Sequence, residues 1–80
     1  MQIEFIGLSK RAYNALKRNG LHTVEDVLEM KPRQLLTMRG IGQELLMQIY
    51  GKIQKAGYEI PYIYQKRLEA ISNNRIGQDD

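Results

Sequence analysis

The sequence predicts a compact all-α domain of four to five helices. Apolar residues recur at spacings of three and four along most of the chain, as on one face of a helix. Serine, threonine and proline stand where helices would begin, and glycine stands where they would end. The alternation typical of strands is nearly absent. With 80 residues, the protein has room for a single domain.

The first helix is expected from Lys10 to Asn19. Ser9 is placed as its N-cap, and Leu8 and Tyr13 occupy the positions of a hydrophobic staple. Gly20 follows as a left-handed stop.

Two short helices are expected next. Thr23 can cap the second helix in a capping box with Asp26, three residues later. This helix should end near Lys31, because a proline disfavours helical geometry in the residue before it. Pro32 then suits the first turn of a third helix. The residues expected to be buried in the third helix are Leu35, Leu36 and Met38.

A long fourth helix follows the glycine pair and should end at Gly57. It contains Gly51, which would allow close packing of another helix. Its apolar stripe consists of Leu46, Ile49, Tyr50, Ile53 and Ala56. A fifth helix is expected over residues 61–73, followed by a frayed polar tail over residues 74–80.

The composition excludes several classes of function. The protein has no cysteine and one histidine, His22, which argues against disulfides, a zinc site and a cysteine or serine–histidine nucleophile. The carboxylates form no acid–base pair, so we expect no enzyme, no cofactor, no metal and no small-molecule substrate. Apolar runs are too short to span a membrane, and the N-terminus does not resemble a signal peptide. A cytoplasmic binding module is the resulting expectation.

Positive charge is concentrated near the N-terminus. The net charge is +3, and most of the excess comes from Lys10, Arg11, Lys17 and Arg18, opposed in residues 1–20 only by Glu4. A local basic patch suits a polyanion such as nucleic acid. The alternative is an ordinary solvated helix face.

The segment Gly40-Ile41-Gly42 lies between a short helix and a long one. Glycines let the backbone approach a phosphate closely, and the first N–H groups of the next helix are unpaired donors. Helix–hairpin–helix units bind nucleic acid in this way, with Ile41 expected to point inward as an anchor. The alternative is a tight turn that binds no ligand.

The first helix offers a second candidate surface. Arg11, Asn14 and Arg18 share one face at helical spacing, and Lys17 borders it. An arginine with an asparagine suits a narrow minor groove, while lysine suits phosphate. Simple solvation of this face is the alternative.

Aromatic residues gather around Pro61. This cluster consists of Tyr58, Ile60, Tyr62, Ile63 and Tyr64. It is expected either to dock on the core or to form an exposed patch for a partner.

Residues 6–17 (IGLSKRAYNALK), 20–28 (GLHTVEDVL) and 35–42 (LLTMRGIG) together resemble the C-terminal domain of the bacterial RNA polymerase alpha subunit. The resemblance covers about residues 6–60 without gaps. We therefore expect residues 1–60 to form such a domain, with residues 61–80 as an extra C-terminal helix and tail. Because few residues precede the motif, the subunit's assembly domain is expected to be absent, as in a stand-alone small protein or an excised part of a longer one.

The resemblance implies a helix–hairpin–helix domain that binds the minor groove of AT-rich promoter DNA and contacts sigma factors and activators. It implies that Arg11 enters the groove with Asn14 beside it, that Lys17 is the lysine of the same helix, and that the Gly42 backbone meets phosphate. The full predicted DNA-binding set is Arg11, Asn14, Lys17, Arg18, Gly40, Gly42 and Gln43.

The sequence also departs from the family pattern. Glu44 stands where the family has a lysine, Leu45 replaces a phosphate-contacting serine, and Gly40 replaces an asparagine. An acidic position that contacts sigma factor is Gly7 here. Two functions therefore stay open. One is a DNA-binding, transcription-associated module. The other is a protein-interaction module that contacts RNA polymerase, sigma factor or a regulator through Leu45 or the Tyr62–Ile63 region.

Overall fold

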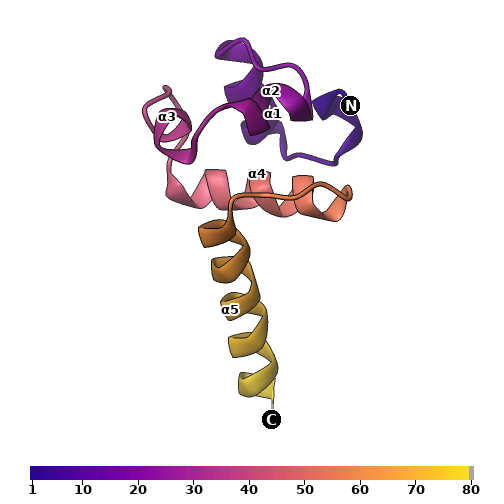
Figure 1. The fold of residues 1–80 in the computed structure, drawn as a ribbon, viewed down its shortest axis with the longest axis vertical. Coiled ribbons are helices and arrows are strands. Elements are labelled where there is room, and N and C mark those ends of the chain that lie inside the picture. The colour runs from indigo at the N-terminus through magenta and orange to yellow at the C-terminus, as the bar shows by residue number, and fades with distance from the viewer. Residues whose placement is uncertain (80) are drawn as a thin grey trace.

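The computed structural model describes the backbone of residues 1–79 and the side chains of residues 1–71. This part of the protein has five α-helices and a short 3₁₀ helix but no strand, which confirms the all-α prediction. The elements are η1 (Ile3–Phe5), α1 (Lys10–Arg18), α2 (Val24–Glu29), α3 (Pro32–Leu36), α4 (Gln43–Lys55) and α5 (Tyr62–Asp79). The first four α-helices form the body of the domain, and α5 extends away from α4 (Figure 1).

The predicted capping residues begin α1 and α2. Ser9 Oγ accepts from the N–H of Ala12 at 3.2 Å, and Thr23 Oγ1 accepts from the N–H of Asp26 at 2.9 Å. Asp26 Oδ2 in return accepts from the N–H of Thr23 at 3.1 Å, which completes the capping box. Each cap satisfies a first-turn donor that the helix itself leaves unpaired.

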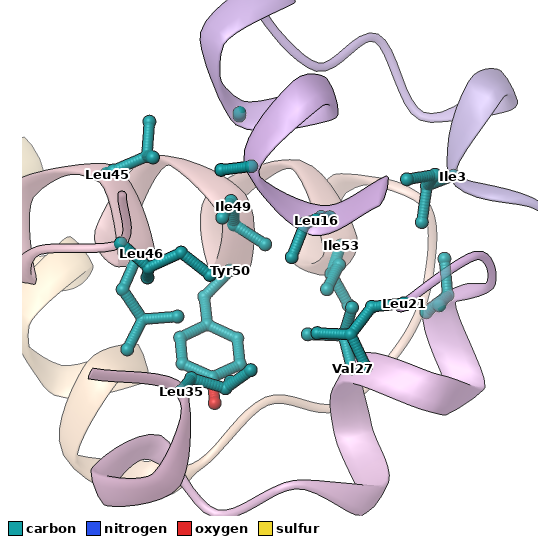
Figure 2. Packing of buried hydrophobic residues seen from close by; sticks show 14 of the residues in the cluster. Ile3, Leu16, Leu21, Val27, Leu35, Leu45, Leu46, Ile49, Tyr50 and Ile53 are labelled. Carbon is teal, nitrogen blue, oxygen red and sulfur yellow. The ribbon is translucent and has the colours of Figure 1, made fainter. Parts of the chain in front are cut away.

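The core lies where α1, α2, α3 and α4 meet. Tyr50 of α4 sits at its centre with no exposed surface, among Leu16 of α1, Val27 of α2 and Leu35 of α3 (Figure 2). Ile53 continues the predicted stripe of α4 and is also fully buried. These apolar residues come from helices well separated in sequence, so their burial holds the helices together.

Two of the residues predicted to be buried in the third helix are only partly covered. Leu35 is fully buried, whereas Leu36 and Met38 are half-buried against the core. The helix α3 has five residues, little more than one turn, so it presents only one position squarely to the core. Ala56, at the end of the α4 stripe, is half-buried as well.

The N-terminal segment adds an element that the sequence pattern did not predict. Ile3 begins η1 and is 1% exposed. Its N–H donates to the carbonyl oxygen of His22 at 3.1 Å, and the N–H of Val24 donates to the carbonyl oxygen of Met1 at 2.8 Å. These two hydrogen bonds attach the first residues of the protein to the α1–α2 loop and to the first residue of α2.

The last helix begins at Tyr62 and packs on α4 through its first turns. Tyr64 is 4% exposed, with its ring centroid 4.9 Å from that of Tyr50. Leu68 covers Gly51, where a Cβ atom would lie 3.9 Å from Leu68 Cδ2. The expected close packing at Gly51 is therefore present, at an ordinary contact distance.

The helix α5 is longer than predicted. Its backbone continues as a helix to Asp79 instead of ending near Asn73, so the expected polar tail is helical over residues 74–79. The last residue of that predicted tail, Asp80, lies outside the described residues. No proline interrupts residues 62–79, so nothing in the sequence forces an earlier stop. Within the part of the protein described, no helix is long and apolar enough to cross a bilayer.

The aromatic cluster around Pro61 divides between the two expected roles. Ile60 and Tyr64 join the core, and Tyr58 is half-buried against it. Tyr62 and Ile63 point to solvent and are 72% and 58% exposed. The helical turn that starts α5 separates these positions, because neighbouring residues point in different directions.

Candidate nucleic-acid interface

Helix α1 and the turn between α3 and α4 meet at a shallow hollow of about 270 Å³. Its lining residues are Arg11, Asn14, Ala15, Arg18, Arg39 and Gly40. Four of the seven residues predicted to bind DNA are thus brought together: Arg11, Asn14, Arg18 and Gly40. The α1 face and the hairpin, which were predicted as two surfaces, thus border one hollow.

Helix α1 has one buried face and one exposed face, and its exposed face lines one side of the hollow. Ala12, Ala15 and Leu16 are buried, so residues at the complementary spacing face solvent. Arg11, Asn14 and Arg18 line the hollow together from that outer side. The helix therefore presents two guanidinium groups and one amide on the same side.

The turn is anchored as predicted. Ile41 is 4% exposed and packs into the core. Gly40 has a φ of 86°, a left-handed conformation that favours glycine. Gly42 is the N-cap of α4 and has no side chain to accept from the first-turn N–H groups. Those donors remain available to an outside acceptor, as an anion-binding helix start requires.

The turn also lies close against α1. A Cβ atom on Gly40 would lie 3.8 Å from Cβ of Ala15. The side-chain amide of Asn19, the C-cap of α1, donates to the carbonyl oxygen of Ala15 at 2.7 Å and to that of Arg39 at 3.2 Å. One side chain therefore joins the end of α1 to the turn.

The hollow is strongly basic. Arg11, Arg18 and Arg39 all line it, and no carboxylate does among the described residues. Ion pairs in the described part of the protein involve the N-terminal amine, Lys17 and Lys66 as cations, and none of these three arginines. The positive charges of the three guanidinium groups are thus not balanced by an ion pair among the described residues.

Lys17 lies outside the hollow. Its Nζ is 3.0 Å from Glu4 Oε2 and 5.5 Å from the centre of the Tyr13 ring. The hydrogen bond with Glu4 raises the pKa of the Lys17 ammonium and lowers the pKa of the Glu4 carboxyl. The Lys17 charge is consequently already partnered within the protein, on a neighbouring face of α1.

The side chain of Gln43, a predicted DNA-binding residue, is hydrogen-bonded to α5. Its Oε1 accepts from the Tyr64 hydroxyl at 2.9 Å and from Arg67 Nη1 at 3.4 Å. The side chain is thus directed to α5, and the first N–H of α4 remains beside Gly42.

The two residues after the hairpin that depart from the family pattern lie in different environments, one exposed and one buried. Glu44 is exposed in the first turn of α4, where its charge lies near the unpaired N–H groups. Leu45 is 4% exposed and belongs to the core. The expectation that Leu45 contacts a partner is therefore wrong, because its position on α4 faces inward with Leu46 and Ile49.

Sequence reasoning missed two residues of this site. Arg39 precedes the hairpin glycine directly, and a basic residue at that position was a signal for it. Asn19 was expected only as the end of the first helix, because its bond to Arg39 spans 20 residues and no local pattern reveals it.

A larger open groove of about 660 Å³ lies between α1, α4 and α5. Its apolar lining includes Leu8, Met47, Leu68 and Ile71. Elsewhere the described residues contain no group of three histidine, cysteine, aspartate or glutamate side chains that could hold a metal. His22 has an exposed side chain, and its backbone N–H donates to Asp26 Oδ2 at 3.0 Å.

The fold and the glycine hairpin define a small helical domain with a helix–hairpin–helix. Residues 1–55 match the family of the C-terminal domain of the bacterial RNA polymerase alpha subunit, and the protein belongs to this family.

Its relatives include proteins named DNA-directed RNA polymerase subunit alpha. The sequence is 44% identical over 63 residues to that of Roseiflexus sp. (strain RS-1), covering 79% of this protein and 19% of the relative. It is 33% identical over 60 residues to that of Desulforudis audaxviator (strain MP104C), covering 75% and 19%. The corresponding values for Clavibacter sepedonicus are 35% over 60 residues, covering 75% and 18%. The match thus spans about a fifth of the length of these relatives. The family assigns the protein to transcription-associated modules.

Proposed function

We propose that this protein is a non-enzymatic, cytoplasmic DNA-binding module of transcription. In this proposal, α1 enters the minor groove of AT-rich duplex DNA, and the Gly40–Gly42 hairpin binds phosphate. The observation that carries the proposal is the shared hollow, in which Arg11, Asn14 and Arg18 lie beside the hairpin. Groove and phosphate contacts to one stretch of duplex require both surfaces on the same side of the domain.

Each residue has a distinct role in the proposal. Arg11 would enter the groove, because a narrow AT-rich groove concentrates negative potential that attracts arginine. Asn14 would offer its amide to base edges, and Arg18 would bind the flanking backbone. The unpaired N–H groups after Gly42 would hold one phosphate. Lys17 would add a weaker contact, since Glu4 competes for its charge.

A second candidate function is favoured by specific observations. Glu44 opposes phosphate at the start of α4, while Tyr62 and Ile63 are exposed on α5. The groove between α1, α4 and α5 has an apolar lining. Exposed apolar surface of this kind marks protein interaction sites. In this second function the domain contacts RNA polymerase, sigma factor or a transcription regulator and binds little DNA.

The deciding experiment is a titration of the protein against a short fluorescent AT-rich duplex at low and at moderate salt. A GC-rich duplex of equal length is the control. The DNA role predicts binding that prefers the AT-rich duplex and weakens steeply with salt. Arg11→Ala should remove most of this binding while the helical circular dichroism signal stays unchanged.

One outcome would contradict the DNA role, and another would contradict only the role of Arg11. Absence of binding at low salt would direct the search to protein partners. Undiminished binding by Arg11→Ala would refute the groove role of that residue.

A further inference from the structure

We propose that Arg39 is a further DNA-binding residue and that Asn19 positions it in one surface with Arg11 and Arg18. The inference rests on the DNA role proposed above and deepens it. It adds a third arginine from the hairpin side to the two supplied by α1.

The position of Arg39 is the first argument. Its side chain is exposed and lines the hollow that Arg11 and Arg18 also line. It takes part in none of the ion pairs of the described residues. Arginine presents its donors in a planar fork that suits phosphate oxygens. A phosphate bound at the hairpin would thus meet a cation that partly compensates the repulsion from Glu44.

The link through Asn19 is the second argument. The Asn19 amide donates to the carbonyl oxygens of Ala15 and Arg39, at 2.7 and 3.2 Å. The first bond fixes the amide on the last turn of α1, and the second holds the backbone of Arg39 itself. Both donors of the amide are used within the protein, so Asn19 is a positioning residue rather than a DNA contact.

Local geometry makes this link consequential. The turn is short, with Gly40 at a φ of 86° and one reverse-turn bond from the N–H of Ile41 to the carbonyl oxygen of Met38 at 3.2 Å. The buried side chain of Ile41 anchors the turn in the core. The hydrogen bond from Asn19 holds the turn against α1, so that Arg39 lines the same hollow as Arg11 and Arg18.

The test is a double-mutant cycle with Arg39→Ala and Asn19→Ala, measured as affinity for the AT-rich duplex. Arg39→Ala should weaken binding about 5-fold to 10-fold. It should also reduce the slope of log affinity against log salt concentration by about one unit, the value for one lost phosphate contact. Asn19→Ala should weaken binding about 5-fold, as expected for a lost hydrogen bond. In the Asn19→Ala background, Arg39→Ala should cost less than about 2-fold, because the two effects are coupled.

A matched control and a readout without DNA complete the experiment. Gln54→Ala removes an exposed amide side chain near the other end of α4 and should leave binding unchanged. Asn19→Ala should also accelerate hydrogen exchange at the Ile41 N–H, which closes the turn. Circular dichroism should show the same helix content for all variants.

Each failure has its own signature. An Arg39→Ala variant that binds as tightly as the unchanged protein, while Arg11→Ala binds poorly, would overturn the role of Arg39 alone. Equal costs of Arg39→Ala in both backgrounds, with unchanged exchange at Ile41, would overturn the positioning role of Asn19. Absence of duplex binding by the unchanged protein would overturn the proposed function itself, together with the role of Arg39.

Discussion

Tyr64 of α5 donates a hydrogen bond to Oε1 of Gln43, the first residue of α4, over 2.9 Å. Its ring packs on Tyr50 with 4.9 Å between ring centroids. The bond joins the last helix to the residue that starts the long helix, next to the hairpin. The two tyrosines differ in one respect: the hydroxyl of Tyr50 is buried without a hydrogen-bond partner among the described residues.

That difference predicts opposite effects of removing the two hydroxyl groups. Tyr64→Phe should lower the free energy of unfolding by about 1 kcal/mol, the net value of one hydrogen bond. Tyr50→Phe should leave it unchanged or raise it by about 1 kcal/mol, because it removes an unsatisfied buried polar atom. Urea unfolding of both variants measures the difference. A clear loss of stability in Tyr50→Phe would mean that its hydroxyl has a partner in solution.

Competition between Glu4 and DNA for Lys17 gives a second prediction. Glu4→Gln removes the carboxylate 3.0 Å from Lys17 Nζ and should strengthen duplex binding several-fold at low salt. The slope of log affinity against log salt concentration should steepen by no more than about one unit, the value for one added phosphate contact. In the Lys17→Ala background the effect of Glu4→Gln should shrink to the small change expected from net charge. Equal gains in both backgrounds would show that Lys17 is not involved.

The charge of Glu44 gives a third prediction. Glu44→Lys should strengthen binding to both duplexes and steepen the salt slope by about one unit, because it adds a cation beside the phosphate site. Glu59→Lys makes the same change of net charge at an exposed position beyond the other end of α4. If both variants gain equally, the gain is due to net charge, and the start of α4 does not contact phosphate.

The capping box of α2 predicts how stability depends on pH. Hydrogen bonds from the N–H groups of His22 and Thr23 lower the pKa of the Asp26 carboxyl. Because the pKa is lower in the folded state, the ionised Asp26 carboxylate stabilises the fold at pH values above its unfolded pKa of about 3.9. This stabilisation is lost as the pH falls through the lower folded value.

The corresponding variant is Asp26→Asn. It should be less stable than the unchanged protein at pH 7, and the difference should shrink as the pH falls below the unfolded value and through the lower folded pKa of Asp26, where the carboxyl becomes neutral like the amide. Urea midpoints over this range supply the measurement. Glu29→Gln, at an exposed position of the same helix, is the control and should alter the pH dependence much less. A constant difference between Asp26→Asn and the unchanged protein at all pH values would contradict the prediction.

Much of the fold was predictable because its signals are local. Ser9, Thr23 and Pro32 mark three helix starts that the structure confirms. The spacing of apolar residues likewise predicted the α4 stripe that forms the core. Such signals act within a few residues, over one or two helical turns, and a linear sequence displays them directly.

The candidate site was predictable residue by residue but not as an arrangement. Helical spacing placed Arg11, Asn14 and Arg18 on one face, and in the structure they line one hollow. Lys17 was assigned to the same surface, yet its pairing with Glu4 depends on how the N-terminal segment folds back. The prediction for Leu45 was wrong because one position on a helix faces solvent or core according to what packs against it.

By itself the sequence determined the family, the helix boundaries set by caps and prolines, and the basic character of α1. These properties are encoded in residue order and short-range spacing. Only the tertiary structure decided that the hairpin lies against α1, that Asn19 bonds to Arg39, and that Gln43 turns to α5. Each of these contacts spans 20 residues or more, so it exists only once burial of the shared core has brought the helices together.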